Sequence, residues 1–301
     1  MIDRREQAAV LALVAHSRGE WYKTAALIEE ARSAVRIVDG EWTGFEPLEV
    51  KETTLRQEIT PAELEGYLEM IGSLEQQGVR LLTILDEDYP RNLREVYNRP
   101  PFLFVRGELV PDDEQAVAVV GTRRASPEGI GEARSLASQL PERGVTVLSG
   151  LALGIDAAAH SATLEAGGRT VAVMGTGIKR IYPAQHGELA EQISRGGALV
   201  SQFWPDAPPT KYSFPMRNVV MSGMAIGTVV VEASNTSGAR MQARLALEHG
   251  KRLFLVESLV LRESWARRYA EYPGTTVVES VDDVVDVLTA TSRQVEQLTL
   301  G

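Results

Sequence analysis

The sequence predicts an α/β protein: a mostly parallel sheet covered by helices on both faces and preceded by a small helical domain. Three observations predict this class. From residue 116 onward, short runs of Val, Leu and Ala alternate regularly with longer helical segments. The short runs are almost wholly apolar, as in strands that are buried on both faces of a sheet. Residues 1–77, in contrast, show the spacing of apolar residues that is typical of helices.

Composition narrows the class further. The 301 residues, 44% of them hydrophobic, are enough for one large core and a smaller domain. The absence of cysteine excludes disulfides, cysteine nucleophiles and thiolate metal sites. The first residues include no apolar segment of the kind found in signal peptides, and no apolar run approaches the roughly 18 residues of a membrane span. We therefore expect a cytoplasmic protein without a membrane partner.

The net charge of −10 argues against a nucleic-acid partner, but the charges are unevenly distributed. Residues 117–256 contain 14 Lys and Arg against 10 Asp and Glu, a local charge of +4. The other residues contain 17 Lys and Arg against 31 Asp and Glu, a charge of −14. The predicted sheet domain is therefore compatible with a short polyanion, although its charge is too small to require one.

The N-terminal elements are predicted from helix-boundary signals. Thr60 is a suitable N-cap, Pro61 suits the first helical position, Glu63 completes a capping box, and Gly78 can end the helix. In order, we expect helices over residues 7–15 and 21–38, a polar loop over residues 41–57, and a helix between residues 60 and 78 that completes a small bundle.

The sheet is expected to begin with two strands, over residues 79–85 and 102–107. The alternation that follows predicts strands over residues 116–120, 145–149, 169–174, 198–201, 227–232 and 252–256, and helices over residues 127–141, 155–166, 187–195, 215–224 and 238–250. We expect an N-terminal helical domain at 1–77, a sheet domain at 78–290 and a tail at 291–301.

Three of the predicted strands run directly into turns rich in Gly, Ser and Thr. These turns lie at Gly121–Arg123, Ser149–Ile155 and Ser234–Gly238. Ligands of parallel sheets bind outside the carboxyl ends of the strands, and a helix that starts there directs free N–H groups at an anion. Together the three turns predict a site for a phosphate-bearing ligand.

We expect the binding groups in these turns and in two basic segments. Arg123 and Arg217 can bind phosphate through two hydrogen bonds each, and the basic pair at 179–180 precedes Tyr182, on which a base can stack. The predicted phosphate-binding residues are Gly121, Thr122, Arg123, Ser149, Gly150, Gly154, Lys179, Arg180, Arg217, Asn218, Ser237, Gly238 and Arg240.

Several residues near these turns have a structural alternative. Asp156 and His160 lie one helical turn apart and could form an acid–base pair or bind a metal. No further ligand stands at the right spacing, so we interpret both as structural and expect no metal or other cofactor. Glu232 could bind a sugar hydroxyl or brace its loop, and Phe214 could line the site or belong to the core. The two basic residues before Tyr182 could be an ordinary surface turn.

Several motifs occur in a distinctive order along the predicted sheet domain. They are Asp88-Tyr-Pro90, Pro100-Pro-Phe-Leu-Phe-Val-Arg-Gly107, Gly121-Thr-Arg-Arg-Ala-Ser126, Ser149-Gly-Leu-Ala-Leu-Gly-Ile-Asp156 with His160, Met174-Gly-Thr-Gly177 before Ile181-Tyr-Pro183, Phe214-Pro-Met-Arg-Asn218, and Val230-Val-Glu-Ala233 with Ser237-Gly238. This order, over roughly residues 79–256, resembles the family of DNA-processing protein A, also called DprA or Smf.

The resemblance implies an extended Rossmann-like fold and a protein, not an enzyme, that binds single-stranded DNA through the residues above. It also implies a homodimer that loads the RecA recombinase onto that DNA. The sequence departs from the family pattern where Val219 follows Arg217 and Asn218, since a further basic residue is usual there. No C-terminal winged helix is evident in the sequence. We therefore expect a divergent member of the family.

A second candidate function belongs to a different class. Phosphoribohydrolases of the wider Rossmann superfamily resemble this fold, so a nucleotide-sensing or nucleotide-hydrolysing protein is the alternative. Their Pro-Gly-Gly loop is absent from the corresponding stretch, Ser222-Gly-Met-Ala-Ile-Gly-Thr-Val-Val-Val-Glu232. Its absence disfavours hydrolysis but leaves nucleotide sensing open. A third alternative is a scaffold that has lost ligand binding.

Overall fold

The computed structural model of the protein describes residues 3–17, 19, 21–41 and 59–299. Its centre is a nine-stranded sheet with the strand order β1-β2-β6-β5-β4-β3-β7-β8-β9. The strands from β6 to β9 in this order are parallel to one another, whereas β2 pairs antiparallel with both β6 and β1 at one edge. The α/β class and the mostly parallel sheet are therefore confirmed.

Each of the eight strands that the sequence predicts is present, four with the predicted bounds and four shorter than predicted. β1 stops at Thr83 rather than Leu85, because the Asp86 carboxylate accepts hydrogen bonds from the N–H and the hydroxyl of Thr83, both at 2.9 Å, and turns the chain. The strands are β1 (Val79–Thr83), β2 (Phe102–Gly107), β3 (Ala116–Val120), β4 (Thr146–Ser149), β5 (Thr170–Val173), β6 (Ala198–Ser201), β7 (Gly227–Val230), β8 (Arg252–Val256) and β9 (Thr275–Val278).

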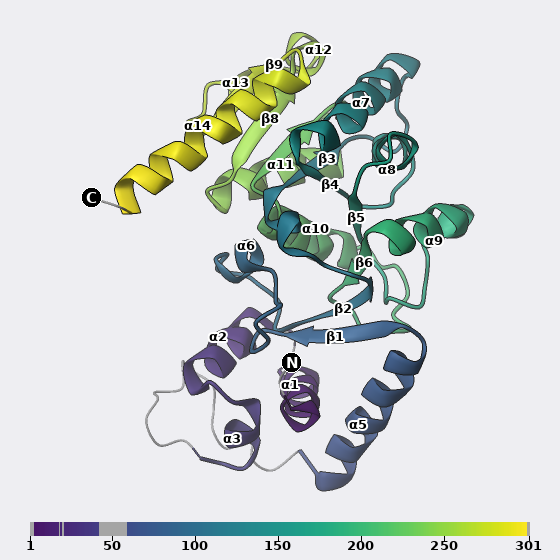
Figure 1. Cartoon of the computed structure of the whole chain (residues 1–301), viewed down its shortest axis with the longest axis vertical. Helices are drawn as coiled ribbons and strands as arrows, with labels where there is room; N and C mark the ends of the chain where they lie inside the picture. The colour runs from purple at the N-terminus through teal and green to yellow at the C-terminus, as the bar shows by residue number, and fades with distance from the viewer. Residues whose placement is uncertain (1–2, 18, 20, 42–58, 300–301) are drawn as a thin grey trace.

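Helices cover both faces of the parallel part of the sheet (Figure 1). One face carries α7 (Pro127–Gln139), α8 (Ile155–Glu165) and α9 (Gly187–Gly196), and the other carries α10 (Ser213–Met224) and α11 (Gly238–Glu248). Shorter connecting elements are α6 (Arg91–Arg94) and the 3₁₀ turns η1 (Pro111–Gln115), η2 (Pro141–Arg143) and η3 (Ala184–His186).

The direction in which the sheet grows changes at β3. The chain adds β4, β5 and β6 on one side of β3, then returns through α10 and adds β7, β8 and β9 on the other side. Such a reversal leaves a crevice between the two strands at the switch, outside their carboxyl ends. The crevice between β3 and β7 is therefore the place where this fold can hold a ligand.

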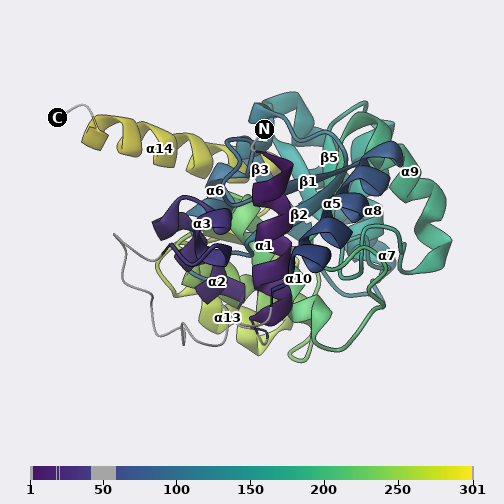
Figure 2. The same ribbon diagram turned by 90° about the horizontal axis from the view of Figure 1, so that it is seen from below.

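The N-terminal helices pack on the antiparallel edge of the sheet, next to β1 (Figures 1 and 2). Gln7 donates a hydrogen bond to the Leu81 carbonyl at 3.0 Å, and the rings of Trp21 and Phe102 lie 5.7 Å apart. These helices therefore share one apolar core with β1 and β2. The helices are α1 (Arg4–His16), α2 (Trp21–Ala31), α3 (Ala34–Val38) and α5 (Pro61–Gln76).

The predicted boundaries of α5 are confirmed. The Thr60 hydroxyl accepts a hydrogen bond from the Glu63 N–H at 3.2 Å, Pro61 is the first helical residue, and Gly78 has a φ of +73° just after the helix ends. The polar loop expected over residues 41–57 lies almost wholly outside the described residues.

The prediction of one helix over residues 21–38 is wrong. Arg32 adopts a φ of +54°, and Ser33 then caps a second helix by accepting a hydrogen bond from the Arg36 N–H at 3.1 Å. The carboxylate of Glu6, on α1, accepts hydrogen bonds from the N–H groups of Ala34 and Val35 at 2.7 and 3.1 Å. These hydrogen bonds hold the start of α3 against α1, and they are available only because the helix breaks at Arg32.

The sequence did not predict the elements after β8. They are α12 (Glu257–Arg262), α13 (Ser264–Ala270), β9 and α14 (Val281–Thr299). Trp265 fixes this segment to the sheet, since its ring is fully buried and its N–H donates to the Ala233 carbonyl at 2.9 Å. Because α14 passes residue 290 without interruption, the helix does not end at the expected boundary, and the division into domains stays a prediction. None of the described helices is long and apolar enough to cross a membrane.

Candidate functional site

A pocket of about 390 Å³ lies at the crevice between β3 and β7. Its walls come from the turns after these two strands and from α10, with contributions from Ala152 and from Asp156 on α8. The predicted residues that line it are Gly121, Thr122, Arg123, Arg217, Asn218, Ser237 and Gly238. The structure thus brings together residues that are more than one hundred positions apart in the sequence.

Arg217 supplies a buried positive charge to this pocket. Only 6% of the residue is exposed, and one guanidinium nitrogen donates to the Val173 carbonyl at the end of β5, at 2.9 Å. Burial lowers the pKa of Arg217, whereas the charge of Asp156 raises it. Arginine nevertheless stays protonated in proteins, so the floor of the pocket holds a permanent cation.

Gly150 makes room for that cation. A Cβ at this position would overlap the guanidinium group of Arg217. The Gly150 N–H and the Ala152 N–H donate to the Asp156 carboxylate at 3.1 and 3.4 Å. Burial raises the pKa of the Asp156 carboxyl, while the charge of Arg217 and these N–H groups lower it. Asp156 therefore holds the turn after β4 in the shape that Arg217 requires.

The other residues predicted in this turn also have structural roles. The Ser149 hydroxyl is fully buried and donates to the Val119 carbonyl at 2.7 Å, which joins β4 to β3. Gly154 has a φ of +77°, and a Cβ there would overlap the Thr122 carbonyl. Ser149, Gly150 and Gly154 are not among the described residues that line the pocket. Their predicted contact with a ligand stays a prediction.

Arg123 and two aromatic rings lie close together beside the pocket. The guanidinium of Arg123 lies 4.7 Å from the centre of the Phe214 ring, and the Tyr182 ring lies 5.9 Å from the Phe214 ring. Tyr182 is 45% exposed. Phe214 lines the pocket, so of its two alternatives the structure favours the site over the core. A cation and two rings at one rim can hold both a phosphate and a base.

The turn after β7 contributes the start of α11. The Ser237 hydroxyl accepts a hydrogen bond from the Ala239 N–H at 3.1 Å, and Asn218 donates to the Gly238 carbonyl at 3.4 Å. Arg240 lies outside the pocket lining and donates to the carbonyl and the side chain of Asn235, at 3.0 and 2.7 Å. The N-terminus of an eleven-residue helix thus faces the pocket, where its dipole favours an anion.

Glu232 braces the two turns. Its carboxylate accepts hydrogen bonds from the N–H and the hydroxyl of Ser126, both at 2.9 Å, at the start of α7. The Ser126 hydroxyl in turn caps α7 by accepting from the Gly129 N–H at 3.0 Å. Of the two alternatives for Glu232, the structure shows the brace.

The basic pair at 179–180 lies outside the pocket lining. Lys179 forms an exposed ion pair with Asp206 at 3.2 Å, and Arg180 is exposed. Both precede Tyr182, so they adjoin the rim rather than the floor. One basic lining residue was missed: Arg124 lines the pocket together with Arg123, and the signal available for it was its place in the same Gly-Thr-Arg-Arg turn.

Asp156 and His160 have separate structural partners. The Thr170 hydroxyl donates its proton to the Val147 carbonyl at 2.7 Å. Nδ1 of His160 lies 2.7 Å from the Thr170 hydroxyl oxygen and is therefore the donor in that hydrogen bond. Burial lowers the pKa of His160 to about 3. Within the described ranges, no group of three or more His, Cys, Asp and Glu side chains could hold a metal ion.

The fold and the motifs match a known family over most of the chain. A family model described as DNA recombination-mediator protein A matches residues 80–289. The chain belongs to this family, DprA/Smf. Protein Smf of Escherichia coli (strain K12) is 44% identical over 182 residues, which are 60% of this chain and 49% of that protein. The chain thus spans about half the length of that relative.

Two further comparisons support the assignment, and a third shows the same fold. DNA processing protein DprA of Bacillus subtilis (strain 168) is 32% identical over 216 residues, which are 69% of this chain and 73% of that protein. The crystal structure of DprA from Streptococcus pneumoniae is 29% identical and superposes with a TM-score of 0.72 over 95% of this chain and 98% of that chain. DprA from Helicobacter pylori, whose single-stranded-DNA binding mode has been described, shares the fold at 24% identity and a TM-score of 0.63, over 71% of this chain and 96% of that chain.

His160 makes the stability of the fold depend on pH. Its pKa is about 3 in the folded chain and about 6.5 when unfolded, so below pH 6.5 only the unfolded chain takes up the proton. The free energy of unfolding is therefore unaffected at pH 7 and falls as the pH drops from 6.5 towards 3. At pH 5 the loss due to this residue is about 2 kcal/mol.

Urea unfolding of the wild type and of His160→Asn at pH 7 and pH 5 measures this loss. The Asn amide nitrogen is bonded to Cγ, as Nδ1 of His is, so it can donate to Thr170 but does not titrate, and His249 is common to both proteins. We expect the wild type to lose about 2 kcal/mol more than the variant between the two pH values. Parallel losses would contradict the assignment of a buried, neutral His160.

Proposed function

We propose that the chain is a recombination mediator that binds single-stranded DNA in the pocket between β3 and β7. The observation that carries the proposal is the buried cation of Arg217 at the ligand-binding crevice of this fold, in a chain of the DprA/Smf family. A phosphate can pair with Arg217 only by entering the pocket, where the start of α11 adds a second favourable charge. The binding of single-stranded DNA by the Helicobacter pylori protein of the same fold agrees with this proposal.

The rim accounts for a preference for single strands. Bases in a duplex are already stacked, whereas those of a single strand are free to stack on Phe214 and Tyr182. Arg123, stacked on Phe214, is placed to pair with the phosphate beside such a base. Stacking accepts every base, so the proposed binding is tolerant of sequence.

The basic pair extends the proposed path of the strand along the rim. Lys179 is held only by an exposed ion pair with Asp206, and such pairs contribute little, so a phosphate can replace the carboxylate. Ser149, Gly150 and Gly154 take part by shaping the turn that contains them. Arg240 orders the loop before α11 and contributes its charge to the same edge.

Replacing Arg123 with Ala tests the proposal. The side chain is exposed and stacks on a ring, so its loss should leave the fold intact and weaken binding of a labelled oligo-dT by about 1–3 kcal/mol at low salt. The slope of log affinity against log salt should become shallower by roughly one. Fluorescence anisotropy over a salt series measures both quantities.

Two further variants complete the experiment. Arg195→Ala removes an exposed arginine on α9 that pairs only with Glu191 one helical turn away, and should bind as the wild type does. Arg217→Lys keeps the buried charge but loses the second hydrogen bond, and should bind more weakly. If Arg123→Ala binds oligo-dT as tightly as Arg195→Ala, or if thymidine monophosphate competes as well as the oligonucleotide, the pocket is not a single-strand site.

We also propose that the chain is not an enzyme, because its two carboxylates near the pocket are already engaged. Glu232 accepts from Ser126, and Asp156 accepts from the turn after β4, so neither is free to act as a general base. Purified protein should release no base, nucleoside or phosphate from single-stranded DNA or from nucleoside monophosphates, with or without Mg²⁺. Product that disappears in Asp156→Asn or Glu232→Gln would identify the nucleotide-hydrolysing alternative instead.

The partners implied by the family complete the proposal: a cytoplasmic homodimer that hands its bound DNA to RecA. Sedimentation should give twice the mass of one chain. The protein should also shorten the lag before RecA coats single-stranded DNA that is already covered by a single-strand-binding protein, and Arg123→Ala should not, because it holds the DNA too weakly. A monomer at micromolar concentration would refute the homodimer. An equal lag with and without the protein would refute the transfer of DNA to RecA.

A further inference from the structure

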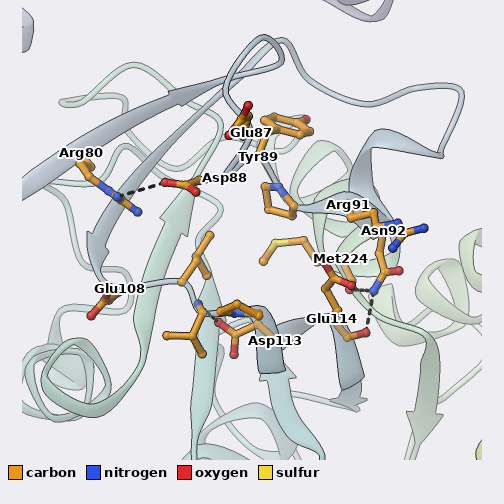
Figure 3. Close-up of a pocket in the computed structure, with 14 residues that line it drawn as sticks. Arg80, Glu87, Asp88, Tyr89, Arg91, Asn92, Glu108, Asp113, Glu114 and Met224 are labelled. Carbon is orange, nitrogen blue, oxygen red and sulfur yellow. Dashed lines mark hydrogen bonds and ion pairs between the residues drawn. The ribbon is translucent and has the colours of Figure 1, made fainter. Parts of the chain in front are cut away.

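A second cavity lies at the opposite end of β3, and its chemistry is the reverse of that of the first. It has a volume of about 350 Å³ and is bounded by the loop after β1, the connection between β2 and β3, and the end of α10 (Figure 3). β3 has five residues, so about 16 Å of strand separates the two sites. We call it the amino-edge cleft.

Leu109, Val110, Pro111 and Met224 give the amino-edge cleft an apolar surface, and its walls are fixed. Tyr89 is buried and donates to the Pro100 carbonyl. The Asn92 amide, in the segment after β1, donates to the Glu114 carbonyl at 2.8 Å and to the Met224 carbonyl at 3.1 Å. One side chain thus connects all three segments that bound the cleft. The cleft is therefore formed before any ligand arrives, which lowers the entropy cost of binding.

The rim of the cleft is acidic and largely unpaired. Glu87, Glu108 and Glu114 are exposed, lie on different sides of the opening (Figure 3), and form no ion pair within the described part of the chain. The other two carboxylates are neutralised: Asp88 lies 3.6 Å from Arg80, and Asp113 lies 2.7 Å from Arg169. Arg91 also lines the cleft, is exposed and forms no ion pair among the described residues, so the free charges of the rim are three glutamates and one arginine, a net charge of −2.

We propose that the amino-edge cleft docks a basic segment of a partner protein. Lys and Arg have long apolar stems that can lie on the apolar surface while their charged ends reach the glutamates. An apolar side chain next to them in sequence can fill the remaining volume, since a cavity of this size holds a few side chains and not a helix. The net negative charge of the rim disfavours the phosphates of DNA, so this partner can bind while the crevice between β3 and β7 is occupied.

The test uses the full chain and a labelled peptide, Lys-Leu-Arg-Lys-Leu-Arg, followed by fluorescence anisotropy. The triple variant Glu87→Gln, Glu108→Gln, Glu114→Gln should bind this peptide about tenfold more weakly, because three exposed charge pairs are lost. The matched control, Glu65→Gln, Glu69→Gln, Glu271→Gln, removes three exposed glutamates elsewhere and should change the affinity by less than about twofold. A peptide in which 2,3-diaminopropionic acid replaces Lys and Arg keeps the charge but lacks the apolar stem, and should also bind about tenfold more weakly.

Two measurements keep this inference separate from the proposed DNA site. The rim variant should unfold at the same urea concentration as the wild type and should bind oligo-dT with unchanged affinity. Equal losses of peptide binding in the rim and control variants would overturn the proposal, since attraction would then come from the net charge of −10 alone. Spermine binding as tightly as the peptide would assign the cleft to a free polyamine, and self-association that disappears in the rim variant would assign it to a second copy of the chain.

Discussion

The buried guanidinium of Arg217 is the constraint on which the arrangement of the binding edge depends. A charge in the interior is costly unless it is paired and hydrogen-bonded, and the penalty amounts to several kcal/mol per ion. Here the compensation comes from three separate elements: the carbonyl at the end of β5, the carboxylate of Asp156 on α8, and the open space beside Gly150 after β4. The position of α10 relative to the sheet therefore follows from one side chain.

A second carboxylate has the same role on the other side of the crevice. Glu232, after β7, holds Ser126 and with it the start of α7, which follows β3. The two turns that border the crevice are thus fixed to each other, while Asp156 fixes the turn after β4. In the sequence, Asp156 could belong to an acid–base pair and Glu232 could bind a sugar hydroxyl, and each also had a structural alternative. In the structure they are acceptors for the backbone, and the result is a preformed pocket.

The sequence predicted the parts of the fold that depend on local pattern. Continuous apolar strands, the cap at Thr60 and the order of the motifs needed no knowledge of the tertiary structure. The break at Arg32 was missed because the apolar spacing continues across it, and only the long-range contact of Glu6 with the start of α3 explains it. β9 was missed because the segment before it lacks an apolar run, and its position depends on Trp265, which packs against the end of β7.

Of the predicted site residues, the two arginines line the pocket, whereas several of the small residues do not. Arg123 and Arg217 are charged and follow the turns, so their chemistry restricts them to the crevice. Ser149 and Gly150 can equally serve the backbone, and a sequence cannot show that the Ser149 hydroxyl bonds to Val119 or that Gly150 accommodates an arginine 67 positions later. Such a pair becomes visible only when the strands are side by side.

The separation of charge along β3 explains how an acidic chain can bind a polyanion. Electrostatic interactions through solvent decay with a screening length of about 10 Å at 0.1 M salt. The three free glutamates stand at one end of β3 and the buried Arg217 at the other, about 16 Å of strand away, so the acidic rim is screened from a phosphate in the crevice. The net charge of −10 is thus a property of the whole surface, whereas the field at the crevice is set by the few charges within one screening length. The cations that line the pocket are Arg123, Arg124 and Arg217, while the carboxylates of Asp156 and Glu232 are already hydrogen-bonded to the backbone.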